Sequence, residues 1–149
     1  MGTVADGANM MTSAVYSLTP FCAWLVAGVL KFLINSVRAK RLAFGLIGYG
    51  GLPSNHSAIV SSMAALVGIR EGIDHPAFGV ALTLAFIVIL DAASLRKQIE
   101  KHAISINRLD TGSDLPRLRE RIGHTRLEIA AGVVSGIAVA VLVQFIFDQ

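Results

Sequence analysis

The sequence predicts an all-α fold: a polytopic helical membrane protein with about four transmembrane helices, in which residues 1–149 form a single membrane-embedded domain. Hydrophobic residues make up 54% of the chain and charged residues only 15%, whereas a soluble domain has about 25% charged residues. The charges are also segregated. Four long stretches contain no Asp, Glu, Lys or Arg, and they lie between Asp6 and Lys31, Arg41 and Arg70, Asp74 and Asp91, and Glu128 and Asp148.

The first two apolar runs differ in length. The run from Ala14 to Val37 is long enough for a complete span, which needs about 17–25 residues. The second runs from His56 to Glu71 and, at about 16 residues, is short for a crossing. It fits a span that is thinner at one end or partly re-entrant, an arrangement that is tolerated where the backbone is buried in protein.

The last two runs carry local signals of helix start and helix packing. Pro76 suits the first turn of a third span that ends near Leu95. The fourth span is expected from Leu127 to Phe147 and contains the motif Gly132-x-x-x-Gly136. Small residues at this spacing let a neighbouring helix approach closely.

Between these two spans lies a basic segment from Arg96 to Thr125. It should begin as a helical extension, because residues 92–108 contain no Gly or Pro, and the sequence DTGSDLP should then end the helix. Twelve of the thirteen Lys and Arg residues lie at the end of the first span, in the loop after it, or in residues 96–126. The positive-inside rule makes this face cytoplasmic in a multi-pass protein of the inner membrane.

The net charge of +3 fits this juxtamembrane bias and does not indicate nucleic-acid binding, because aromatic residues are not interleaved with the basic ones. Cys22 is the only cysteine, so an intramolecular disulfide is excluded.

Polar residues beside membrane spans are costly and by default suggest function. Four groups of them fall at the same predicted face, since the first and third loops of a four-span protein share a side. They are Lys31-x6-Arg38, the sequence GGLPSNHS at positions 50–57, Asp91 with Arg96 and Lys97, and His124-x3-Glu128.

This set has the chemistry of a phosphate site. The start of a helix offers free N–H groups and a positive dipole end, and Ser54 can cap the second span there. Lys31 and Arg38 would add positive charge to the phosphate oxygens. His124 and Glu128 share one helical face, so the carboxylate can fix the imidazole tautomer, and His56 could protonate a leaving oxygen.

Each group also has a purely structural interpretation. Lys31 and Arg38 would be interfacial anchors, and Asp91 would form a bridge to Arg96 or Lys97. GGLPSNHS would be a capped loop, and His124 with Glu128 a surface pair. A close ligand cluster such as H-E-x-x-H does not occur in the sequence, so neither a metal nor another cofactor is expected.

Together the motifs resemble the type 2 phosphatidic acid phosphatase superfamily, which includes vanadium-dependent haloperoxidases and carries K-x6-R-P, P-S-G-H and S-R-x5-H-x3-D. Here Ala39 replaces the proline, Asn55 the glycine, Glu128 the aspartate and Leu118 the arginine. The chain is most similar to a divergent branch of that superfamily. The motifs shared with this branch are GG-x-PS-x-HSA, DAA-x-x-R and GHT-x-x-E-x-x-x-G, which begin at positions 50, 91 and 123.

The resemblance implies a phosphatase acting on a lipid or isoprenoid phosphate. His124 would be the nucleophile, oriented by Glu128, and His56 the general acid. Lys31, Arg38 and Ser54 would bind phosphate, and Arg96 would be the first substitute for the missing arginine. The alternatives are a non-catalytic binder or carrier of a phosphorylated lipid, and a structural membrane protein. We expect the chain to assemble as a homodimer.

Overall fold

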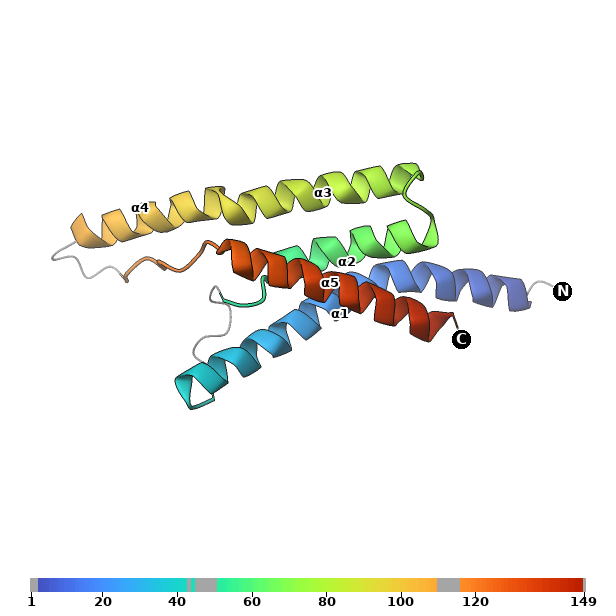
Figure 1. The fold of residues 1–149 in the computed structure, drawn as a ribbon, viewed down its shortest axis with the longest axis horizontal. Coiled ribbons are helices and arrows are strands. Elements are labelled where there is room, and N and C mark those ends of the chain that lie inside the picture. Colours follow the sequence, from blue (N-terminus) through green and yellow to red (C-terminus); the bar gives the residue numbers. More distant parts are fainter. Residues whose placement is uncertain (1–2, 43, 45–50, 110–115, 149) are drawn as a thin grey trace.

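The structure, a computed structural model, describes residues 3–42, 44, 51–109 and 116–148, with the backbone alone for residues 3–13. All regular structure in these ranges is helical, which confirms the all-α prediction (Figure 1). The helices are α1 (Thr3–Ala39), α2 (Asn55–Arg70), α3 (Pro76–Ala93), α4 (Leu95–Leu109) and α5 (Arg126–Phe147). Gly50 and most of the predicted DTGSDLP break lie outside the described residues.

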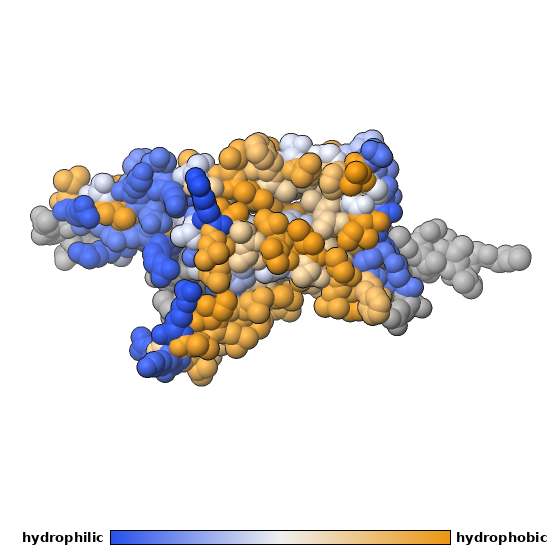
Figure 2. Space-filling view, viewed as in Figure 1, coloured by the Kyte–Doolittle hydropathy of each residue, from blue (hydrophilic) through white to orange (hydrophobic). Residues whose placement is uncertain are grey.

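Three segments are long and apolar enough to cross a membrane: Ala14–Ala39, Pro76–Leu109 and Arg126–Phe147. Their outward faces carry large exposed apolar side chains, such as Phe21, Phe86 and Phe145, each more than 60% exposed. On the face drawn in Figure 2, apolar residues cover the middle of the molecule and hydrophilic residues gather towards its ends. Because water does not favour such a surface and lipid does, the prediction of a polytopic helical membrane protein is confirmed.

The second predicted span is the 16-residue helix α2, which is not among these three segments. At about 1.5 Å per residue it is roughly 24 Å long, less than the hydrocarbon core of about 30 Å. α2 instead occupies the centre of the bundle, in contact with α1, α3 and α5. Its buried serines are satisfied internally: the Ser62 hydroxyl donates to the Ile59 carbonyl (2.8 Å), and the Ser61 hydroxyl to the Ser57 carbonyl. α2 is therefore a helix enclosed by protein.

The small-residue motif of α5 lies against α2. A Cβ added at Gly132 would collide with the carbonyl oxygen of Ser54, and one at Gly136 with that of Ala58. The two helices also share a hydrogen bond, from the Ser54 amide to the Glu128 carbonyl (2.8 Å). This close approach fixes the start of α2 beside the start of α5.

The helical extension predicted after the third span is present as a separate helix. α3 ends at Ala93, and the Ser94 hydroxyl donates to the Leu90 carbonyl (2.6 Å) before α4 begins. α4 extends away from the bundle beyond α3 (Figure 1). The start of α2, the end of α3, all of α4 and the start of α5 consequently lie at one end of the molecule, towards which the second half of α1 also runs.

Candidate functional site

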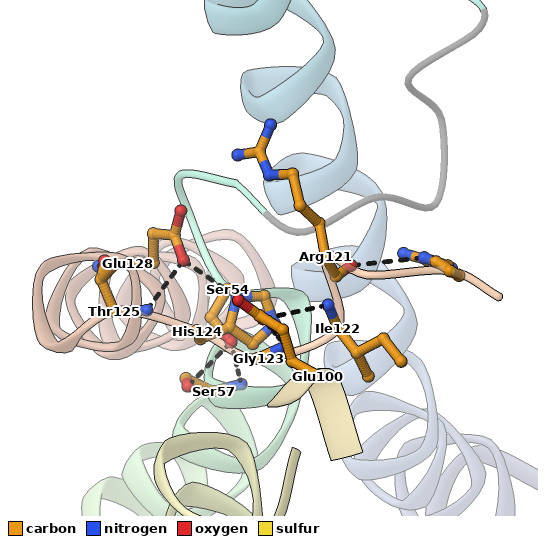
Figure 3. Close-up of polar contacts among 10 residues, drawn as sticks. Ser54, Ser57, Glu100, Arg121, Ile122, Gly123, His124, Thr125 and Glu128 are labelled. Carbon is orange, nitrogen blue, oxygen red and sulfur yellow. Dashed lines mark hydrogen bonds and ion pairs between the residues drawn. The ribbon is translucent and has the colours of Figure 1, made fainter. Parts of the chain in front are cut away.

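Glu128 has two contacts at the start of α5. Thr125 caps the helix: its hydroxyl accepts from the Glu128 amide (3.2 Å), and the Glu128 carboxylate accepts from the Thr125 amide (2.9 Å). The same carboxylate oxygen lies 3.3 Å from Nδ1 of His124. The carboxylate is thus held by the capping box while it meets the ring (Figure 3).

His124 is 5% exposed. With Nδ1–H donating to the Glu128 carboxylate, the lone pair lies on Nε2. Burial lowers the pKa of His124, and the positive charges of Lys31 and Arg96 lower it further, against the opposing effect of Glu128. The ring is therefore neutral at pH 7, with a free Nε2 lone pair, as a nucleophile requires.

Ser54 caps the start of α2. Its hydroxyl oxygen accepts from the Ser57 amide (3.4 Å) and the Ser57 hydroxyl (3.0 Å), while its carbonyl accepts from the Ala58 amide (3.1 Å). The backbone amides of Asn55 and His56, in the first turn of α2, have no acceptor among the residues that the structure describes. Such donors favour an anion.

Two buried polar atoms lie in the same turn. Asn55 Oδ1 and His56 Nδ1 have no hydrogen-bond partner among the described residues. Buried polar atoms are normally paired, by protein groups or by ordered water, so these two atoms are open to a water molecule or a ligand.

The structure brings the two predicted histidines together. The ring centroids of His56 and His124 are 6.1 Å apart and the rings are tilted by 56°. One ring comes from the first turn of α2 and the other from the residue before the cap of α5. A phosphate with a hydrogen bond of about 3 Å to each side can contact both rings at this separation.

Lys31 lies beside the loop that leads into α2. A Cβ at Gly51 would be 3.9 Å from Lys31 Cγ and 3.6 Å from Asn35 Oδ1. Gly51 has a φ of +153°, in the region that favours glycine. The close approach keeps the ammonium group within electrostatic reach of His124.

Arg38 is placed differently. It lies in the last turn of α1, seven residues or about 10.5 Å beyond Lys31 along the helix. Its side chain is exposed, and the structure gives it no polar contact among the described residues. The structure therefore shows no polar contact between Arg38 and the two histidines.

Arg96 and Asp91 form an ion pair across the junction of α3 and α4. Arg96 Nε donates to Asp91 Oδ2 (2.8 Å), and both side chains are about one-third exposed. The bridge expected from a structural interpretation is thus present. The guanidinium is still near enough to His124 to lower its pKa.

Several residues at this end, Lys97 apart, carried no assigned role in the sequence analysis. A cavity of about 120 Å³ lies beside His124 and Glu128, and its other lining residues are Lys97, Glu100, Arg121, Gly123 and Thr125. The capping box T-x-x-E was visible in the sequence and could have been recognised. No local pattern connects Glu100 to His124, since they are 24 positions apart. Within the described ranges, no three His, Cys, Asp or Glu side chains could hold a metal ion.

The fold and this polar end define a multi-pass helical membrane protein with two neighbouring histidines, of which His124 is buried and His56 is partly buried. The chain belongs to the divergent PAP2 family, whose profile matches residues 13–139. A relative is the uncharacterized membrane protein YuiD of Bacillus subtilis (strain 168), which is 28% identical over an alignment of 148 positions. This alignment covers 87% of this chain and 94% of that protein. The search of solved structures gives no significant match. The predicted resemblance to a divergent PAP2-related branch is thereby confirmed.

Proposed function

We propose that this protein hydrolyses a lipid or isoprenoid phosphate through a phosphohistidine at His124. The observation that carries the proposal is the pair of rings 6.1 Å apart, one of them bonded through Nδ1 to Glu128. Two imidazoles on either side of one phosphorus can act as nucleophile and acid, which neither can do alone.

The reaction has two steps. Nε2 of His124 attacks phosphorus, a P–N bond forms, and the P–O bond to the lipid breaks as the protonated form of His56 gives its proton to the leaving oxygen. The neutral His56 then takes a proton from a water molecule as the water oxygen attacks phosphorus. A new P–O bond forms, the P–N bond breaks, and inorganic phosphate leaves neutral His124 and protonated His56 behind. Glu128 orients the ring and stabilises its positive form in the first step.

Three observations support a phosphate-binding site beside the two histidines. The backbone amides of Asn55 and His56 have no protein acceptor among the described residues, and free amides at the start of a helix can donate to a phosphate. Lys31 lies beside the loop at Gly51, and Arg96 is close to His124. We assign Ser54 the task of capping α2 and shaping this turn, because its hydroxyl is fully buried against Ser57. Arg38 would attract anions from outside.

A membrane-bound substrate is supported by the position of the site, where the apolar band gives way to hydrophilic residues (Figure 2). A phosphorylated headgroup would reach the histidines while its chains stay in lipid. The basic residues of the first and third loops favour the cytoplasmic face.

The test is phosphate release by the purified full-length protein in detergent micelles. Phosphatidic acid, an isoprenoid monophosphate and an isoprenoid diphosphate would each be offered. We expect turnover of at least one of them, its loss in His124→Ala and in His56→Ala, and acid-labile radioactive labelling of the wild type by a ³²P-labelled substrate. His102→Ala is the matched control, since His102 is exposed on α4. Absence of turnover from all three lipids, or turnover that survives His124→Ala, would overturn the proposal.

A second candidate is a non-catalytic binder or carrier of a phosphorylated lipid. The observation in its favour is at position 118, where the superfamily motif has arginine and this chain has a leucine that is 47% exposed. A site with one guanidinium fewer stabilises the transition state less. Lipid binding that survives both histidine substitutions, without turnover by the wild type, would favour this candidate.

A further inference from the structure

The backbone around His124 is held by acceptors from three different helices. The amides of Ile122 and Gly123 donate to one carboxylate oxygen of Glu100 on α4 (3.3 and 3.0 Å). The His124 amide donates to the Ala92 carbonyl on α3 (3.3 Å), and the Thr125 amide to Glu128 on α5. Four successive amides are therefore engaged within the protein, and Figure 3 shows Glu100 and Glu128 beside this segment.

The segment 116–125, which we term the strap, runs antiparallel to α4. It is anchored first by Asn107, whose side-chain amide accepts from the Leu118 amide and donates to the Leu118 carbonyl (both 2.8 Å). The second anchor is Glu100, seven positions earlier on α4. Because Asn107 is 8% exposed and pairs with both backbone groups of one residue, it fixes the register of the strap.

The strap also touches α4 directly. A Cβ at Gly123 would lie 2.7 Å from Lys97 Cγ and 3.1 Å from the Lys97 backbone. Lys97 is one turn from Glu100, so both lie on the same face of α4. The backbone before His124 can reach the Glu100 carboxylate because position 123 has no side chain.

We propose that Glu100 is a positioning residue for His124: its carboxylate fixes the two preceding amides so that Nδ1 meets Glu128 and Nε2 faces His56. The inference deepens the proposed function, on which its consequences for turnover rest. The Glu100 carboxylate contacts this segment as the acceptor of two backbone amides, so an uncharged acceptor of the same shape should replace it.

The experiment compares Glu100→Ala with Glu100→Gln, whose amide oxygen can still accept both hydrogen bonds. Glu120→Ala is the matched control, because Glu120 is an exposed strap carboxylate that contacts Asn107 rather than the backbone beside His124. The full chain, labelled with ¹³C and ¹⁵N in its four histidine rings, would be studied by NMR in micelles. His124 would be assigned with His124→Ala.

In the wild type and in Glu100→Gln we expect the His124 ring to keep one tautomer, protonated on Nδ1, and to titrate below 6.5, the ordinary value. In Glu100→Ala the tautomers should mix and the titration midpoint should rise towards 6.5. Where the protein turns over lipid phosphate, kcat should fall about tenfold or more in Glu100→Ala with little change in KM, since small misplacements of a reacting group are costly.

An unchanged His124 tautomer and titration in Glu100→Ala would overturn the inference, and so would an equal change in Glu120→Ala. If circular dichroism shows that Glu100→Ala is unfolded, Glu100→Asp is used instead: it keeps the charge but is too short to reach both amides. The NMR result does not need turnover, so it stands or fails independently of the proposed phosphatase activity.

Discussion

Gly132 of α5 lies directly against the carbonyl oxygen of Ser54, the residue that caps α2. This contact brings together two helix starts that are separated by about 70 positions in the sequence, and with them His56 and His124. The site thus depends on a helix crossing that contains no catalytic group.

Gly132→Ala should therefore destabilise the bundle. The added methyl group collides with Ser54 O and Ser57 Cβ, and overpacking of this kind costs about 1–3 kcal/mol. The measurement is the melting temperature of the purified protein in detergent. Gly79→Ala is the control, because a Cβ at this α3 position meets nothing within 4 Å. The melting temperature of Gly79→Ala should equal that of the wild type or be slightly higher. An equal decrease in melting temperature in the two variants would contradict the close contact between α2 and α5 at Gly132.

Removing the Thr125 cap of α5 should lower the stability of the protein without changing the orientation of the His124 ring. Thr125→Ala deletes the hydroxyl that accepts from the Glu128 amide, at a cost of about 1 kcal/mol. The contact between Glu128 and His124 is retained, so the tautomer of His124 should persist while the melting temperature falls. Glu128→Ala removes the carboxylate that meets both His124 and the Thr125 amide, and should abolish the tautomer preference in the ¹⁵N spectrum. Identical ¹⁵N spectra for Thr125→Ala and Glu128→Ala would contradict the assignment of capping to Thr125 and of ring orientation to Glu128.

The stability of the protein should decrease as the pH falls below neutrality. Burial lowers the pKa of His124 in the folded state below its ordinary value of 6.5. Between those two values the unfolded state binds more protons than the folded state, so unfolding becomes easier as the pH falls. The contribution is complete above pH 6.5 and is lost below it. Melting temperatures from pH 8 to pH 5 test this. His124→Gln should reduce the slope in that range, and the remaining slope should come from His56, whose pKa burial also lowers.

Lys31 and Arg38 should differ in their effect on anion binding. Lys31 lies beside the loop at Gly51, whereas Arg38 is exposed at the end of α1. Inorganic phosphate should bind about tenfold more weakly in Lys31→Ala, a loss of about 1.4 kcal/mol. In Arg38→Ala the change should be about twofold and disappear at high salt, because exposed charges are screened. A larger effect from Arg38 would mean that α1 closes on the site when phosphate binds.

The polar cluster of Arg70, Gln144 and Asp148 lies at the opposite end of the bundle. It should stabilise the fold without taking part in phosphate binding. Arg70 is 12% exposed, donates to Gln144 (2.6 Å) and lies 3.8 Å from Asp148. Arg70→Ala should destabilise the protein by about 1–3 kcal/mol, as expected for a lost charged hydrogen bond. Phosphate binding should be unchanged, and a substantial loss of binding in a folded Arg70→Ala protein would show that the two ends are coupled.

The limits of sequence reasoning are visible in particular residues. Apolar runs and charge-free stretches predicted α1, α3 and α5, because the length of a span is set by the bilayer itself. The Gly132-x-x-x-Gly136 motif predicted a close helix contact but could not name α2 as the partner. The short second run was recognised as atypical, and the structure shows why: α2 is enclosed by the other helices.

The amino-acid pattern alone was enough to predict a helical membrane protein with His56, His124 and Glu128 at one end, because consecutive helices that run back and forth place alternate connections on the same side. The three-dimensional packing was needed to show that the two rings lie 6.1 Å apart, that Arg38 makes no polar contact among the described residues, and that Glu100 accepts from two amides of the strap. These outcomes depend on contacts between helices distant in sequence. Such contacts follow from side-chain shape and close packing, which periodicity and composition do not encode.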